Sequence, residues 1–120
     1  RFHGFVSDTS ELYENVDVAV VPSVRPEEFS RVCAEAQVRG IPSVVTGPGG
    51  AGEVVAHGET GLVGNADDVD DLLAALLRLD DDRAELARFG AAGAVRMREL
   101  FSIERYHQRM TEVIGAALGQ

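Results

Sequence analysis

Two glutamates eight residues apart, Glu27 and Glu35, are the side chains of this sequence best placed for chemistry. They belong to residues 22–36, a segment that follows an apolar run and opens a helical pattern. Ligands of open α/β sheets bind at such points, where the free amides of a helix N-terminus attract anions. On one continuous helix the two carboxylates would stand about 12 Å apart along the axis and about 80° apart around it. That separation suits an extended ligand with a hydroxylated ring at each end and phosphates between them.

The same two glutamates also have an ordinary interpretation. Carboxylates near a helix N-terminus are commonly solvated, and they complement the positive end of the helix dipole. The spacing of Glu27 and Glu35 does not separate this interpretation from a binding role. The residues around them must decide.

The elements that would position this segment alternate short apolar strands with helical patterns. We expect strands at residues 2–5, 17–21, 41–46 and 61–63, with short helices after the first and third of them. Residues 18–21 are apolar without alternation, which is typical of a strand covered on both faces. The sequence therefore predicts an α/β fold with a Rossmann-like, doubly wound parallel sheet.

A central helix is expected over residues 29–39, directly within the segment of interest. One apolar face is predicted from four residues at i, i+3, i+4 and i+7: Phe29, Val32, Cys33 and Ala36. Gly40 stands where a helix usually stops. Glu35 falls at the rim of the apolar face, where a carboxylate can reach a cleft without being buried alone.

After residue 65 the patterns are helical only. Asp67 and Asp68 precede a first trailing helix, a second covers about residues 83–99, and Ser102 caps a third. We expect these helices to pack on the sheet or on parts of the protein outside this sequence.

The glycine-rich turn at residues 47–52 leads into a short helix expected at residues 53–56. It is not a P-loop, because no Lys-Ser or Lys-Thr pair follows it. Two interpretations stay open: the turn supplies backbone amides to a ligand, or it is a plain tight turn.

Composition limits the classes of function. The 120 residues suit one core, and the formal net charge of -9 argues against nucleic acid, so a phosphate ligand must be held locally. Cys33 is the sole cysteine and the three histidines have no metal-ligand spacing, so we expect a reducing, cytoplasmic location and no metal. No run is apolar enough to cross a bilayer, no signal peptide is visible, and Arg1 in place of Met suggests that the native protein starts upstream.

Residues 22–36 resemble the signature of the family 4 retaining glycosyltransferases. In that signature a strand ending in Pro-Ser is followed by Glu, a small residue and Phe, and a second Glu comes after seven intervening positions. The matching residues here are Glu27, Phe29, Val32, Glu35 and Ala36. The resemblance covers nearly the whole chain, including residues 2–6, 12–13, 17–18, 40–45, 49–50, 53, 58–63 and 101–102.

The resemblance implies the C-terminal, donor-binding half of a two-domain enzyme of the GT-B type, followed by trailing helices. Such an enzyme transfers a hexosyl-type sugar from a nucleoside diphosphate donor to an acceptor with retention at the anomeric carbon, and needs no metal. Part of this domain and the acceptor-binding N-terminal domain would lie upstream, so residues 1–120 alone should be inactive. Any peripheral membrane association would come through the missing domain.

The resemblance also implies roles for individual residues. Glu27 would be the catalytic residue that contacts hydroxyls of the donor sugar beside the reacting carbon. The donor sugar and diphosphate would be bound at Glu28, Phe29, Ser30, Arg31 and Val32. Backbone amides would bind the diphosphate. Glu35 would bind the ribose. The base would be bound, mainly through the backbone, by Gly4, Phe5 and Val6.

Two positions depart from the family pattern. Glu28 replaces a usual Gly or Pro, and Ser30 replaces a usual Gly, so both add side chains where a sugar or phosphate approaches closely. The Arg and Lys that clamp the diphosphate in the family belong to a region before residue 1. Two alternatives therefore remain: a non-catalytic nucleotide-sugar-binding module, or a sugar-nucleotide epimerase on the same architecture.

Overall fold

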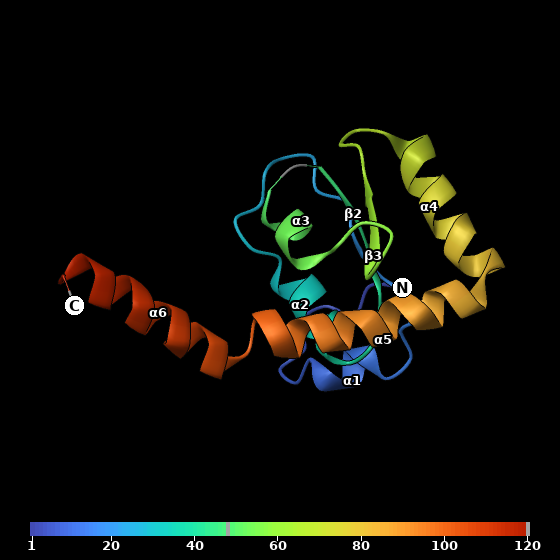
Figure 1. Ribbon diagram of the computed structural model, residues 1–120. Coiled ribbons are helices and arrows are strands. Elements are labelled where there is room, and N and C mark those ends of the chain that lie inside the picture. The colour runs from blue at the N-terminus through green and yellow to red at the C-terminus, as the bar shows by residue number, and fades with distance from the viewer. Residues whose placement is uncertain (48, 120) are drawn as a thin grey trace.

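The computed structural model describes residues 1–47 and 49–119, and within them a three-stranded parallel sheet is flanked by helices (Figure 1). The strands β1 (Ala19–Val21), β2 (Ser43–Thr46) and β3 (Gly61–Gly64) pair in the order β1-β2-β3. Pro48, in the predicted glycine-rich turn, and the terminal Gln120 lie outside the described residues. The parallel sheet with connecting helices confirms the predicted α/β fold class.

Helices cover both faces of the sheet, which explains its unbroken apolar strands. The connections between strands carry α2 (Arg31–Val38) and α3 (Gly50–Val54). On one face Cys33 and Val54 from these helices pack with Val45 of β2. On the other face α4 (Val69–Asp81) and α5 (Arg83–Leu100) bring Leu79 and Phe89 onto Val44 and Leu62.

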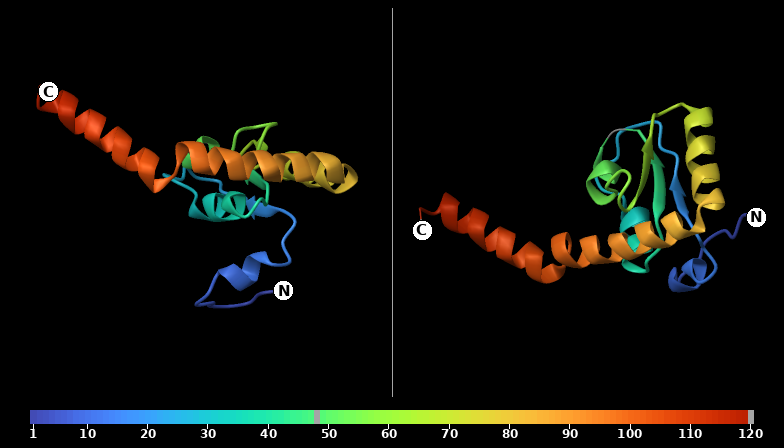
Figure 2. Two further views of the ribbon diagram at one scale, coloured as in Figure 1. Left: turned by 60° about the horizontal axis from the view of Figure 1, so that its bottom comes forward. Right: turned by 45° about the vertical axis from the view of Figure 1, so that its right-hand side comes forward.

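The trailing helices divide into two kinds. α4 and α5 pack on the sheet, as predicted, whereas α6 (Ile103–Ala117) extends away from it, as Figures 1 and 2 show. Its apolar side chains are exposed: Ile103, Tyr106, Met110, Val113 and Ile114. Among the described residues, no helix combines the length and the apolar character that crossing a membrane requires.

The strand predicted at residues 2–5 is wrong. This segment has no regular structure, and the side chains of Phe2 and Phe5 are fully or almost fully exposed. A strand is held by backbone hydrogen bonds to a neighbour, and none of the described strands pairs with these residues. The brief helix expected after it is present as α1 (Ser10–Tyr13).

The central helix begins later than the apolar pattern indicates. Ser30 has an extended backbone (φ -85°, ψ 96°) and caps α2, so Phe29 is not helical and its side chain is 44% exposed. Val32 is also half exposed, and the buried face consists of Cys33, Ala36 and Gln37. Similarly, α3 begins at Gly50, three residues before the predicted start.

Candidate functional site

The loop between β1 and α2 lies at the carboxyl edge of the sheet, where the sequence placed the site. Ser30 closes this loop by accepting a hydrogen bond from the amide of Cys33 at 3.4 Å, and the amide of Ala34 donates to the carbonyl of Ser30. The amides of Arg31 and Val32 precede every position that a helix can pair internally. The N-terminus of α2 therefore offers two amides to an anionic ligand.

The backbone at Glu27 packs directly on the glycine-rich turn. Glu27 forms an isolated parallel bridge with Gly49, and the amide of Gly50 donates to the carbonyl of Glu27 at 2.6 Å. A Cβ atom on Gly49 would lie 2.5 Å from that carbonyl oxygen, and one on Gly50 would overlap the backbone of Glu28. This close approach explains why both positions are glycine. It also means that the amide of Gly50 already has a partner within the protein.

The carboxylate of Glu27 is held from the end of β1. The hydroxyl of Ser23 donates to Oε1 of Glu27 at 2.5 Å, while the carbonyl of Ser23 accepts a hydrogen bond from Oγ1 of Thr46 at 3.1 Å. Among the described residues, Oε2 of Glu27 has no hydrogen-bond partner. One carboxylate oxygen is thus fixed by the protein, and the other can accept from a ligand hydroxyl.

The two positions that depart from the family pattern have different surroundings. The side chain of Ser30 is turned inward to cap α2, and the residue is only 4% exposed, so its hydroxyl does not occupy the space before the helix. Glu28 is exposed beside the N-terminus of α2. Its neighbour Phe29 packs against Phe101 at the end of α5, with ring centroids 5.8 Å apart.

Glu35 faces a groove of about 490 Å³ between α1, β1 and α2. Leu12, Val20 and Val32 give the groove apolar walls. Oε1 of Glu35 lies 3.6 Å from the guanidinium of Arg31, and Oε2 lies 3.4 Å from the hydroxyl of Tyr13. Glu35 is thus only loosely partnered, at the polar edge of an otherwise apolar groove.

The Tyr13 hydroxyl and the Cys33 thiol, both near the site, have shifted pKa values. Burial raises the pKa of Tyr13, and the negative charge of Glu35 raises it further, so the hydroxyl stays protonated and can donate at neutral pH. Burial likewise raises the pKa of the Cys33 thiol beneath the first turn of α2. This thiol is packed in the core and takes no part in the site.

The two glutamates do not share one helix, so the separation expected along a helix axis does not apply. Glu27 lies in the loop and contacts the turn before α3, whereas Glu35 lies in α2 and contacts α1. α3 and α1 lie on opposite sides of α2, as Figures 1 and 2 show. The arrangement still places one carboxylate before the N-terminus of α2 and the other within α2.

The residues expected to bind a base are not brought to this site. Gly4 and Phe5 are exposed, Val6 is half-buried, and no described residue beyond the chain neighbours lies within 4 Å of a Cβ position on Gly4. Conversely, sequence reasoning assigned no role to Ser23 or Tyr13, which contact Glu27 and Glu35. Both are part of the family resemblance, and that was the available signal.

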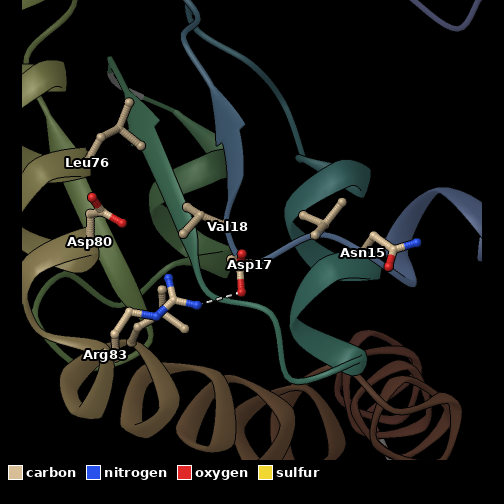
Figure 3. Close-up of a pocket in the computed structure, with 8 residues that line it drawn as sticks. Asn15, Asp17, Val18, Leu76, Asp80 and Arg83 are labelled. Carbon is tan, nitrogen blue, oxygen red and sulfur yellow. Dashed lines mark hydrogen bonds and ion pairs between the residues drawn. The ribbon is translucent and has the colours of Figure 1, made fainter. Parts of the chain in front are cut away.

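A second cavity, of about 410 Å³, lies at the amino end of β1 near α4 and α5 (Figure 3). Arg83 and Asp17 form an ion pair of 2.7 Å at its wall, and Asp80 faces them. None of the predicted site residues lines it. Within residues 1–47 and 49–119, no three or more His, Cys, Asp and Glu side chains converge as metal ligands would.

Comparison with known proteins identifies relatives of this chain. The model of the family "Glycosyl transferases group 1" matches residues 1–96. A D-inositol 3-phosphate glycosyltransferase of Thermomonospora curvata is 38% identical over 90% of this chain and 25% of its own length. A lipopolysaccharide core biosynthesis mannosyltransferase of Rhizobium meliloti is 36% identical over 87% of this chain and 30% of its own length.

Among solved structures, HepE of Anabaena in complex with UDP superimposes with a TM-score of 0.89 and 27% identity. The match covers 97% of this chain and 32% of HepE. These similarities confirm the predicted Rossmann-like domain of a GT-B glycosyltransferase. The chain spans only a quarter to a third of the length of the relatives it matches.

Proposed function

Because this chain belongs to the glycosyl transferases group 1 family, we propose that its site binds the nucleoside diphosphate sugar used by a sugar-transferring enzyme. One observation carries the proposal: the contacts of Glu27 and Glu35 lie on opposite sides of α2, whose first amides are open to an anion. A diphosphate has a sugar on one side and a ribose on the other. The three features can therefore take the three parts of one donor.

Each part of the donor has a proposed contact. Oε2 of Glu27 accepts from a hydroxyl of the donor sugar, because Oε1 is already held by Ser23. The amides of Arg31 and Val32 bind the diphosphate, whose negative charge grows as its bond to the sugar breaks. Glu35 accepts from the ribose hydroxyls.

The finer features of the reaction are also proposed. The sugar leaves the diphosphate and is transferred with retention at the anomeric carbon, with the leaving group stabilised by the fixed amides rather than by a metal ion. We accordingly propose that the protein is a family 4 glycosyltransferase that acts in the cytoplasm. Transfer requires the whole protein, including an acceptor-binding domain that closes over the donor.

The choice of base is open to direct test, and UDP is the first candidate because the matched HepE structure contains it. We expect calorimetric titration of the full-length protein with UDP, GDP and ADP to show binding of one nucleotide. Glu35→Gln should weaken that binding about tenfold, since hydrogen bonds to a charged group are lost. Glu112→Gln, at an exposed position of α6, is the matched control and should leave the affinity unchanged.

The result against the proposal is equally specific. If no nucleotide binds at millimolar concentration, or if the Glu35→Gln protein binds as the wild type does, the donor site is not where we place it. Adding EDTA should not change the affinity, and a loss of binding with EDTA would contradict metal-free recognition.

A non-catalytic binding module is the second candidate, and the exposed Glu28 favours it, because its negative charge beside α2 opposes a diphosphate. This candidate predicts nucleotide-sugar binding without transfer or hydrolysis in the full-length protein. Detection of sugar transfer to an acceptor or to water would exclude it.

A further inference from the structure

Tyr13 connects the short helix α1 to the carboxylate of Glu35. Its hydroxyl lies 3.4 Å from Oε2 of Glu35 and 3.5 Å from the carbonyl oxygen of Val32. The first of these links two elements 22 residues apart in sequence. Tyr13 and Glu35 also line the same groove, beside Val32.

The ring of Tyr13 is itself held in place. The guanidinium of Arg39 stacks over it at 4.8 Å from the ring centroid. Arg39 also donates to the carbonyl of Glu35 at 2.9 Å and to the hydroxyl of Ser10 at 3.3 Å. These contacts fasten Arg39 to both α1 and α2, so the phenol ring has a fixed place between the two helices.

The other partner of Glu35 is much less constrained. Arg31 reaches Oε1 at 3.6 Å, and its side chain is 85% exposed, so this ion pair is weak and screened by solvent. A ligand hydroxyl can displace such a partner at small cost. The two oxygens of Glu35 are therefore unequal: Oε2 faces a packed phenol, and Oε1 faces an exposed surface arginine.

We propose that Tyr13 is a positioning residue that holds the Glu35 carboxylate through Oε2 and turns Oε1 toward the ribose diol of the bound nucleotide. This inference rests on the proposed function of Glu35 and deepens it. The phenol makes no contact with the ligand. It favours one carboxylate rotamer, and the protein thereby selects ribonucleotides over nucleotides that lack the 2′ and 3′ hydroxyls.

The test compares two ligands on full-length wild type and four full-length variants. From UDP, GDP and ADP, the nucleotide that binds wild type most tightly is compared with its 2′,3′-dideoxy analogue by calorimetry. Tyr13→Phe keeps the ring and its stacking on Arg39 but removes the hydroxyl. We expect it to weaken binding of the ribonucleotide about fivefold and to leave the dideoxy analogue unchanged.

Tyr106→Phe is the matched control, because Tyr106 is exposed on α6 and the chain has two tyrosines in all. It should change neither affinity. In a protein that already carries Glu35→Gln, adding Tyr13→Phe should have no further effect on ribose discrimination.

Two results would overturn the inference while leaving the donor site intact. One is an equal loss of affinity for both ligands in Tyr13→Phe, which would indicate a purely structural role. The other is an unchanged affinity of Tyr13→Phe for the ribonucleotide. Failure of wild type to bind any of the three nucleotides would instead overturn the proposed function, and the inference with it.

Discussion

Glu35 and Glu85 both lie beside arginines, yet the two regions treat their carboxylates differently. At the corner of α4 and α5, Arg78 donates to both oxygens of Glu85 at 2.7 Å, and Arg88 adds a contact of 3.2 Å. Glu85 is only 8% exposed. In the groove beside α2, the nearest contacts of Glu35 are 3.4 and 3.6 Å long, and a third of its side chain is exposed.

The difference separates a structural carboxylate from one that has capacity left for a ligand. The hydrogen bonds from Arg78 lower the pKa of Glu85, against the opposing effect of burial, so its charge is satisfied within the protein. Glu35 has no comparable set of partners among the described residues. The presence of an arginine nearby therefore does not distinguish a structural carboxylate from a ligand-binding one. The length and number of the carboxylate's contacts do.

The contacts of Glu35 are loose, whereas the backbone at Glu27 and Glu28, before α2, is tightly packed on the glycine-rich turn, and the largest expected effect comes from this backbone. Gly50→Ala would place a Cβ atom on the backbone of Glu28. We expect a loss of about 3 kcal/mol in the free energy of unfolding, because neither backbone can give way without moving the loop. Urea unfolding followed by circular dichroism measures it.

Gly52→Ala is the matched control for Gly50→Ala. Both glycines lie in α3, but nothing lies within 4 Å of the Cβ position on Gly52. Alanine there should be neutral or raise the stability by up to about 1 kcal/mol, since it favours the helix. Similar losses at the two positions would mean that the loop is not packed on Gly50.

Exchange of Glu85 for Gln tests the comparison directly. Glu85→Gln removes the charge that pairs with Arg78 and Arg88, so it should lower the free energy of unfolding and leave nucleotide affinity unchanged. Glu35→Gln should do the reverse, with little effect on stability because its contacts are long and partly exposed. Equal destabilisation by the two changes would remove the distinction between the regions.

Wild type and Glu85→Gln should also differ in how their free energy of unfolding depends on pH. The pKa of Glu85 is lower in the folded than in the unfolded protein, so its contribution is complete above the unfolded value of 4.5. It is lost as pH falls through the folded value, because the unfolded state then binds more protons. Wild type should lose more stability than Glu85→Gln between about pH 5 and about pH 3. An equal loss of stability in wild type and Glu85→Gln over this range would contradict this assignment.

A smaller loss of stability than at Gly50 is expected at Ser30. Ser30→Ala removes the side-chain cap of α2 and should cost about 1 kcal/mol in the free energy of unfolding. Ser30→Gly, which restores the residue usual in the family, should cost only a few tenths of a kcal/mol. An unchanged stability in Ser30→Ala would show that the hydroxyl does not act as a cap.

The sequence predicted the features that depend on local pattern. The apolar runs at β1, β2 and β3 and the loop before α2 were all expected. The start of α2 was wrong because periodicity counts an apolar Phe29 as helical, whereas the extended backbone of Ser30 prevents it. Residues 2–5 have a strand-like composition, but composition does not supply a partner strand.

The contacts that define the site depend on tertiary packing and had no local signal. Ser23 and Glu27 are four residues apart in a loop, and this spacing in the sequence does not indicate that their side chains meet. Tyr13 reaches Glu35 only because α1 packs beside α2. Likewise, nothing in the local sequence indicates that Glu27 approaches Gly49 and Gly50 so closely.

The buried position of Cys33 makes residues 1–120 convenient for site-specific labelling. Cys33 is fully buried in the core, is the sole cysteine of the chain, and burial raises the pKa of its thiol, so maleimide reagents should leave it unmodified. A single cysteine introduced at Thr9, on the exposed rim of the groove, would then carry the sole fluorophore in these residues. Occupancy of the groove could be followed optically, without radiolabelled donor or any knowledge of the acceptor.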